Sequence, residues 1–540
     1  MGIAKTLTHD YLDPSGILYL TRPHIPEFAA MFERLTNSVL ENARHRIAEL
    51  FDTHAEWFYT LSDGSTQALR RSELDINIAQ NRLILSCWTE KGTRSWRIWG
   101  WNWTGEKLEL QASRRMGAER PVISLIPRAS ASAIAATVRA ARQVRCGQLA
   151  QLASGLLPGV KIERAKLSAG MRRGQPGRYA RILLRLKHHR IAVTGSMAAS
   201  KPSDVDAFLS SALLWFGRTG ERARAPYVQQ LWLLVENELV KPLSLRIALL
   251  RPSLRNAIAV YELDRAWSEL SQVACPDLEE LWRKRLTRFR PIAPPATSES
   301  AQEIIAQAPD AIDVVQARHG ETLRYFGLPF ARVRRLMDSE LVWFGIEGSR
   351  RRLLDEKSAH ELAVLLRKLD EHRSASASDH RHALYRTAGE AWLESLLRRD
   401  ISKLDPGLIV APLHAQFRTA RGGRLGVRPI DLLALRRDGR LVVVELKVAE
   451  DREHVLQGAD YWQRVEAHRR RGHIWRARLF GDRLISAESP LVYLVAPTLR
   501  VHPSLQTLAR LIAPNVEIYR FDLNEDWRSG VRVMRRMRVN

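Results

Sequence analysis

The pattern of hydrophobic and polar positions changes several times along the chain. Apolar residues recur at helical spacing over residues 21–50, whereas residues 57–127 form short alternating segments broken by turn residues, which is typical of β-strands. Clusters of proline and serine at 291–300 and 373–380 predict linkers on either side of a mostly helical stretch. The pattern predicts four parts: an α+β domain over 1–135, a middle lobe over 136–290, a linker and helical connector over 291–380, and an α/β domain over 381–540.

Three tryptophans lie two residues apart in the β region. The segment SWRIWGWNWTG contains Trp99, Trp101 and Trp103, and strict alternation places them on one face of a strand. Such a stripe suits stacking on unpaired bases. The alternative, which we favour, is that it fills the core of a β-sandwich or covers an exposed face of a sheet.

The last part of the chain carries a predicted β-hairpin with acidic residues on its strands. Residues 428–447 read RPIDLLALRRDGRLVVVELK, and the turn signal DG separates two apolar runs. Asp431 lies near the start of the first strand, and Glu445 and Lys447 lie two apart on the second, so both point to the same face. Two buried carboxylates can share a divalent cation, Mg²⁺ or Mn²⁺, although a structural ion pair at a strand end is an alternative.

A metal held in this way suits hydrolysis of a phosphodiester. The cation neutralises charge on the scissile phosphate and lowers the pKa of a bound water, while a lysine positions that water or stabilises the transition state. Asp431, Glu445 and Lys447 are therefore the candidate catalytic residues.

Two predicted helices flank the hairpin. The first, in GEAWLESLLRRDISKL, places Glu390 and Glu394 four apart, where either could be a further metal ligand or a solvated charge. The second, in EDREHVLQGADYWQRVEAHRRR, places Gln457 and Tyr461 one turn apart. Three arginines that could face phosphates follow on it: Arg469, Arg470 and Arg471.

In this order, roughly residues 383–463 resemble the PD-(D/E)xK nuclease superfamily, within its RecB-like branch marked by a Q-x3-Y helix and especially its archaeal-type single-strand and mismatch endonucleases. The resemblance implies a restriction-endonuclease-like domain, a mixed sheet flanked by helices. It implies that Asp431 and Glu445 bind metal, that Lys447 is the catalytic lysine, and that Gln457 and Tyr461 support the site and DNA. The helix acid that this branch carries matches Glu390 better than Glu394, and Gln416 matches a polar residue before the hairpin.

The middle lobe contains a candidate second copy of this domain. Residues 231–267 align on 491–527 without a gap, and RILLRLKHHRIAVTG aligns on DLLALRRDGRLVVVE at an offset of 250. The alternative is that two generic α/β segments of similar period look alike.

In this alignment Arg181 stands in the place of Asp431, Gly195 in that of Glu445, Met197 in that of Lys447 and Arg142 in that of Glu390. We therefore expect a pseudo-dimer with one active centre, which would nick one strand for each binding event. Arg181 and Lys187 of the inert lobe could hold a second strand or a flap.

The composition of the chain indicates a binding partner and a cellular location. Lys+Arg number 84 against Asp+Glu 59, a net charge of +25 on a chain that is 45% hydrophobic, so a folded protein that binds nucleic acid, most simply DNA, is expected. Three separated cysteines and the lack of an apolar run of membrane length predict a cytoplasmic protein. No Walker phosphate loop is present, so any translocation would require a protein partner.

These features lead to one expectation and two alternatives. We expect a metal-dependent DNA endonuclease of nickase type, acting in repair or antiphage defence. The alternatives are a non-catalytic nucleic-acid-binding protein and a nuclease subunit that is inactive without a partner.

Overall fold

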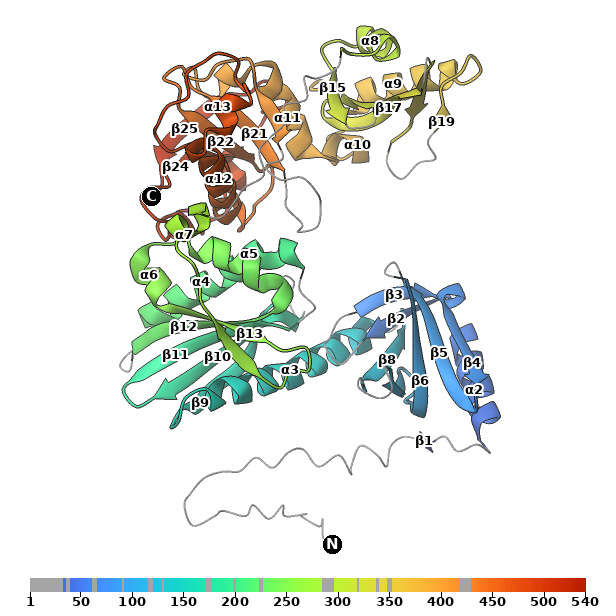
Figure 1. The fold of residues 1–540 in the computed structure, drawn as a ribbon. Coiled ribbons are helices and arrows are strands. Elements are labelled where there is room, and N and C mark those ends of the chain that lie inside the picture. The colour runs from blue at the N-terminus through green and yellow to red at the C-terminus, as the bar shows by residue number, and fades with distance from the viewer. Residues whose placement is uncertain are drawn as a thin grey trace. The chain divides into compact units, whose positions relative to one another are not determined.

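The computed structural model describes the following residues: 33–34, 39–60, 66–89, 92–114, 120–128, 131–170, 176–197, 201–222, 227–283, 296–317, 320–336, 339–346, 352–417 and 429–540. Within them the chain is mixed α/β and forms separate β-sheets with flanking helices (Figure 1). It divides into two compact units, the first comprising 1–148, 166–180 and 197–199, and the second comprising 149–165, 181–196 and 200–540.

The first sheet is antiparallel throughout, with strand order β3-β2-β8-β7-β6-β5-β4 and β1 paired to β6. Its strands are β1 (Glu33–Arg34), β2 (Glu56–Thr60), β3 (Thr66–Arg70), β4 (Leu74–Ala79), β5 (Arg82–Thr89), β6 (Gly92–Trp103), β7 (Leu108–Ser113) and β8 (Val122–Pro127). In the described part of 21–50, the expected helix is α2 (Leu40–Asp52), whereas Glu33–Arg34 forms a strand. Residues 21–32 and 35–38 lie outside the described residues.

The tryptophan stripe does not lie on one face. The register between β6 and β7 shifts between Ile98 and Gly100. This irregularity breaks the alternation, so Trp99 is 42% exposed whereas Trp101 is only 7% exposed. Trp101 lies in the hydrophobic core and Trp103 packs against it, which confirms the core interpretation for these two residues.

The middle sheet has strand order β14-β13-β12-β11-β10-β9, and β11, β12 and β13 are parallel to one another. Its strands are β9 (Lys161–Ala169), β10 (Pro176–Leu186), β11 (His189–Ser196), β12 (Tyr227–Glu236), β13 (Ile258–Leu263) and β14 (Leu270–Val273). The helices around it are α3 (Ala131–Gly155), α4 (Val205–Arg222), α5 (Asn237–Ile247), α6 (Pro252–Asn256) and α7 (Leu278–Arg283).

The C-terminal sheet has the order β20-β21-β22-β23-β24-β25, and β22, β23 and β24 are parallel. Its strands are β20 (His414–Phe417), β21 (Ile430–Leu435), β22 (Leu441–Leu446), β23 (Leu491–Pro497), β24 (Ile518–Leu523) and β25 (Val533–Arg538). Its helices are α10 (Ala383–Arg386), α11 (Gly389–Arg399), α12 (His454–Arg470), α13 (His473–Arg476) and α14 (Leu505–Ala509). The predicted hairpin is present as β21 and β22, which pair antiparallel.

The middle and C-terminal sheets share one topology. In each, a helix follows the third strand and another follows the fourth: α4 and α5 in the first case, α12 and α14 in the second. Gly195 pairs with Leu234 in the middle sheet, and Glu445 pairs with Leu494 in the C-terminal sheet. The two pairs differ by the offsets of 250 and 260 that the sequence alignment uses.

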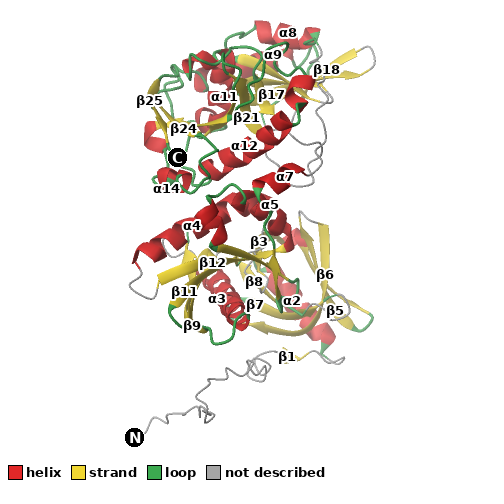
Figure 2. Ribbon diagram, turned by 60° about the vertical axis from the view of Figure 1, so that its left-hand side comes forward, coloured by secondary structure: helices red, strands yellow, loops and turns green. Residues whose placement is uncertain are grey.

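Equivalent elements of these two lobes also face each other. α4 contacts α14, and its counterpart α12 contacts α5 (Figure 2). Between them, the N–H of Arg251 donates to the carbonyl of Leu511 at 2.9 Å, and Leu250 forms an antiparallel bridge with Ile512. Arg251 and Leu511 are equivalent at the offset of 260, so the interface has the reciprocal form of a two-fold dimer.

The prediction of a mostly helical connector is wrong. Residues 312–353 form an antiparallel sheet, β15 (Ile312–Ala317), β16 (Gly320–Tyr325), β17 (Leu328–Leu336), β18 (Ser339–Phe344) and β19 (Arg352–Leu353), flanked by α8 (Glu299–Ala306) and α9 (Ala359–His372). A tight turn joins β16 to β17 at Gly327, whose φ is +78° and where a Cβ would lie 2.0 Å from the carbonyl oxygen of Ala391. The strong helical pattern of AHELAVLLRKLDEH led to a helical prediction for the whole segment, although the residues before it alternate as in β-strands.

The segment 373–380 is not a free linker. Arg373 is fully buried and donates from Nε to the carbonyl of Tyr325 at 2.9 Å and from Nη1 to those of Leu384 and Thr387 at 2.7 and 2.6 Å. Its guanidinium lies 4.8 Å from the ring centroid of Trp392. Burial lowers the pKa of Arg373 to about 9, and its contacts anchor the connector to the C-terminal domain. The prolines at 291–295 lie outside the described residues.

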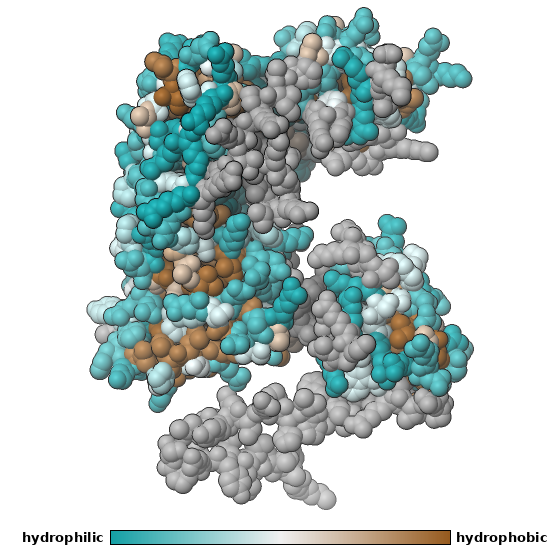
Figure 3. All heavy atoms as spheres, in the orientation of Figure 1, coloured by the Kyte–Doolittle hydropathy of each residue, from teal (hydrophilic) through white to brown (hydrophobic). Residues whose placement is uncertain are grey.

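The surface over the C-terminal domain is mostly hydrophilic in the view of Figure 3, whereas apolar residues gather over the middle lobe. In the part of the chain that the structure describes, no helix combines the length and the apolar character needed to cross a membrane.

Candidate active site

Alternation along β21 and β22 places the two acids on one face of the C-terminal sheet. From Leu432 to Leu446, the even-numbered hydrophobic residues of both strands pack with α11 and the odd-numbered ones pack with α12. Glu445 continues the odd-numbered set, so its side chain lies on the face that α12 covers. The hairpin register, in which Leu432 pairs with Val444, places Asp431 opposite Glu445. The sheet thus brings together two carboxylates that are 14 positions apart in the sequence.

Lys447 lies among carboxylates. Its Nζ is 2.8 Å from Oε1 of Glu445, 3.7 Å from Oδ2 of Asp451 and 3.9 Å from Oε1 of Glu390. Burial alone would lower the pKa of Lys447, but the negative charges of Glu445, Glu390 and Asp431 outweigh it and raise the pKa above its ordinary value. Lys447 therefore keeps its proton at neutral pH.

The carboxyl groups of Asp431 and Glu445 are buried close together, which disfavours ionisation of both. Glu445 is 2% exposed, and burial together with the charge of Asp431 raises its pKa well above the ordinary value. Burial also raises the pKa of Asp431, whose Oδ2 accepts a hydrogen bond from the N–H of Leu446 at 2.9 Å. The buried Oε2 of Glu445 has no hydrogen-bond partner. A bound cation would relieve both the repulsion and the unsatisfied oxygen.

The two candidate helix acids have different surroundings. Glu394 is 2% exposed and accepts hydrogen bonds from Arg324 at 3.1 Å and from Gln416 at 2.6 Å. The side chain of Glu390 is 49% exposed and reaches Lys447. Glu394 therefore has a structural ion pair, whereas Glu390 lies near Lys447.

The structure does not assemble the full predicted set of metal ligands. Among the residues it describes, no group of three acidic, histidine or cysteine side chains is close enough to hold a metal ion. Asp431 and Glu445 meet, but Glu390 does not complete a cluster with them.

The Q-x3-Y residues lie on α12 and are buried. Gln457 donates to Glu453 at 3.2 Å, and its own side-chain oxygen has no partner. Burial and the nearby charge of Glu445 raise the pKa of Tyr461. Arg464 lies over the Tyr461 ring, 4.5 Å from its centroid. Tyr461 thus backs the acidic pair from the helix side.

Two residues of the site were missed from the sequence. Asp451 lies in the loop between β22 and α12, where a spacing of four residues from Lys447 does not by itself predict a contact. His454, the first residue of α12, places Nε2 3.1 Å from the carbonyl oxygen of Glu445. Burial and the charge of Lys447 lower the pKa of His454 to about 4, so this imidazole is neutral.

The arginines at the end of α12 already have partners. Arg469 pairs with Glu466 at 2.6 Å, and Arg470 lies 3.6 Å from the ring centroid of Trp282. Arg471 donates to the carbonyl of Trp282. These contacts hold α7 against α12. We predicted that the three arginines face phosphates, whereas here they have structural partners within the protein.

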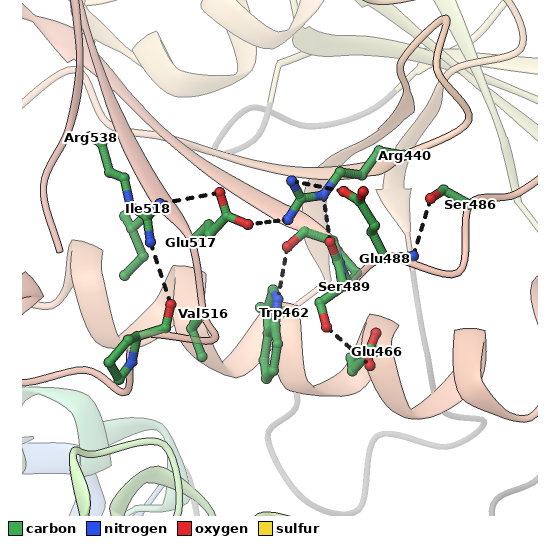
Figure 4. Close-up of polar contacts among 12 residues, drawn as sticks. Arg440, Trp462, Glu466, Ser486, Glu488, Ser489, Val516, Glu517, Ile518 and Arg538 are labelled. Atoms are coloured by element: carbon green, nitrogen blue, oxygen red, sulfur yellow. Dashed lines mark hydrogen bonds and ion pairs between the residues drawn. The ribbon is translucent and has the colours of Figure 1, made fainter.

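Polar contacts also fix α12 to the sheet (Figure 4). Trp462 donates to the carbonyl of Pro490 at 2.9 Å, and Ser489 donates to Glu466 at 3.3 Å. Arg440, in the hairpin turn, pairs with Glu517. The strands and the helix that carry the site are therefore held by contacts away from it.

The equivalent positions of the middle lobe lack acids. A Cβ on Gly195 would lie 2.6 Å from Cδ1 of Leu149, and Met197 is fully buried. Arg181 lies 5.9 Å from the ring centroid of Trp215, and Lys187 is exposed in the turn of the hairpin.

Comparisons of the chain with protein-family models, curated proteins and solved structures give no match. The chemistry of these residues therefore rests on their geometry.

Proposed function

We propose that this protein is a metal-dependent endonuclease that hydrolyses phosphodiester bonds of DNA, with a restriction-endonuclease-like C-terminal domain of the PD-(D/E)xK type. The observation that carries the proposal is the placement of Asp431 and Glu445 on one face of the hairpin with Lys447 beside them. An acid pair with an unsatisfied buried oxygen and a protonated lysine at 2.8 Å is unusual unless a ligand completes it.

The residues present fit Mg²⁺ or Mn²⁺. Such hard cations accept one or two protein carboxylates and take their remaining ligands from water and substrate phosphate, so two acids suffice. Asp431 and Glu445 are the ligands in this proposal. A cation bound here would neutralise charge on the scissile phosphate and lower the pKa of an attacking water.

The other side chains have separate roles. Lys447 is protonated, so it acts by stabilising negative charge on the phosphate rather than as a general base. Glu390 and Asp451 hold the Lys447 ammonium from the more exposed side, and Tyr461 backs the acids.

The middle lobe supports a nicking activity. It has the strand order of the C-terminal sheet but glycine and methionine where that sheet has Glu445 and Lys447. We infer that it is a degenerate copy without catalysis, so a chain that acts as a monomer has one centre and makes one cut.

One observation favours a second candidate, a nucleic-acid-binding protein without catalysis. No three-acid cluster is found among the described residues, and Glu445 and Lys447 already satisfy part of each other's charge. Divalent metal separates the candidates, because cleavage requires it and simple binding does not. A nuclease subunit that needs a partner for activity would bind metal but cut only in the complex.

The experiment is a time course on supercoiled plasmid with Mg²⁺, Mn²⁺ or EDTA, comparing the wild type with Glu445→Gln. We expect open circles as the first product, cutting that stops with EDTA, and no cutting by the variant. Glu371→Gln is the matched control, since the Glu371 side chain is 72% exposed on α9. Cutting that persists in EDTA, or in Glu445→Gln, contradicts the proposal.

A further inference from the structure

We propose that Arg181, Arg218 and Arg452 form a single phosphate-binding track that carries the DNA backbone from the active site onto the middle lobe. This inference rests on the proposed function, because it assigns a path to the substrate of that site.

All three arginines lie at or next to α4. The hydroxyl of Ser210 donates to the carbonyl of Arg452 at 3.4 Å, which holds the loop before α12 against this helix. The guanidinium of Arg181, on β10, lies over the ring of Trp215, and Arg218 follows on α4 and donates from Nε to the carbonyl of Leu214 at 3.0 Å. The side chains of Arg181 and Arg218 and the backbone of Arg452 therefore lie along about two turns of one helix.

The track begins at the active site. Arg452 follows Asp451, whose carboxylate is 3.7 Å from the ammonium of Lys447. At its other end, Arg181 occupies the position in the middle lobe that Asp431 occupies in the C-terminal sheet. A DNA backbone that runs from Lys447 past Arg452 would therefore reach the middle lobe at Arg181, the position equivalent to the acid of the active site.

Within the described residues, the charges of this track have no carboxylate partner. In the described part of the chain, no carboxylate forms an ion pair with Arg181, Arg218 or Arg452. The neighbouring Arg246, by contrast, pairs with both Asp206 and Asp460. Arg218 and Arg452 are exposed.

Like charges held together repel, and a polyanion relieves that repulsion. Burial lowers the pKa of Arg181, and the positive charges of Arg218 and Arg452 lower it further, which agrees with their proximity. Phosphates bound along the track would offset this repulsion and release their own counterions.

The test measures DNA binding in EDTA, where nothing is cut. A labelled duplex is titrated by fluorescence anisotropy at KCl concentrations between about 50 and 200 mM. The variant is the triple Arg181→Gln, Arg218→Gln, Arg452→Gln. We expect affinity at low salt to fall about 10-fold or more, and the slope of log K against log salt to become shallower by about 3. The triple Arg→Lys variant at these positions should keep most of the affinity and the slope.

A matched control removes the same charge elsewhere on the surface: Arg367→Gln, Arg381→Gln, Arg483→Gln, all exposed residues. If this control weakens binding and flattens the slope as much as the track variant does, the track is not a specific path and the inference is overturned. Thermal unfolding of each variant checks that the fold is kept.

Cleavage is scored separately, so the two proposals fail differently. If the wild type never cuts DNA but the track variant binds DNA more weakly than the wild type does, the track proposal stands and the nuclease proposal fails. If the wild type cuts DNA with metal but the track variant binds DNA as well as the control variant does, the nuclease proposal stands and the track proposal fails.

Discussion

The ammonium of Lys447 lies 2.8 Å from Oε1 of Glu445, and both side chains are nearly buried at the end of β22. Removing one member of a buried pair leaves the other charge without compensation, which typically costs about 3–5 kcal/mol. We expect Lys447→Met to lower the free energy of unfolding by about 3 kcal/mol and the double variant Glu445→Gln, Lys447→Met to be more stable than the sum of the single effects. Urea unfolding of the four proteins tests this coupling, and additive effects would show that the pair is not coupled.

Glu390 and Glu394 should respond in opposite ways to substitution. Glu394 lies in a buried ion pair with Arg324, so Glu394→Gln should destabilise the protein by about 2 kcal/mol or more and leave metal-dependent cutting intact. Glu390→Gln, at a half-exposed position, should keep stability but slow cutting. Parallel unfolding and plasmid assays distinguish them. Loss of activity in folded Glu394→Gln would reverse the assignment of the helix acid.

His454 predicts a pH dependence of stability. The pKa of its imidazole is 6.5 in the unfolded chain and about 4 in the folded protein, so the unfolded chain binds the extra proton between these values. The free energy of unfolding should therefore fall as pH falls from 6.5 toward 4, by about 3 kcal/mol in total from this residue.

Urea unfolding across this pH range, compared between the wild type and His454→Gln, measures the contribution. The variant should show a flatter profile, whereas His360→Gln, at an exposed position, should retain that of the wild type. Equal slopes for all three proteins would exclude His454 as the source.

Gly195 tests whether the middle lobe has lost room for an acid. Its Cβ would meet Cδ1 of the buried Leu149 at 2.6 Å and the carbonyl oxygen of Leu234 at 3.1 Å, so Gly195→Ala should destabilise by about 1–3 kcal/mol. Gly217, on α4, has no atom within 4 Å of its Cβ position, and Gly217→Ala should stabilise by about 0.5–1 kcal/mol. A neutral or stabilising Gly195→Ala in chemical denaturation would mean that this position remains open.

Local signals predicted the part of the fold that carries the site. The turn at Asp438-Gly439 lies between two apolar runs, and both strands and α12 form where the pattern indicates. The contact between Glu445 and Lys447 follows from their spacing of two. The pairing of Gly195 with Leu234, like that of Glu445 with Leu494, agrees with the offsets of the sequence alignment.

Other features depend on contacts between distant parts of the chain. In the sequence, Arg373 begins a serine-rich segment that suggests a linker, but its buried guanidinium donates to five backbone carbonyls, those of residues 325, 326, 384, 387 and 388. The face of Trp99 depends on a register shift that alternation alone does not reveal. Arg471 donates to the carbonyl of Trp282, 189 residues earlier in the sequence. Sequence spacing predicts neither kind of contact.

The measurement that bears most directly on the proposed nuclease compares the wild type with Lys447→Ala on one supercoiled plasmid in Mg²⁺, with binding and cutting recorded in the same samples and folding checked by circular dichroism. We predict equal binding by the two folded proteins, nicked circles from the wild type alone, and no nicking when EDTA replaces the metal. Equal cutting by the two proteins, or binding without any cutting by the wild type under these conditions, would contradict the assignment of Lys447 and its acid pair as a nuclease site.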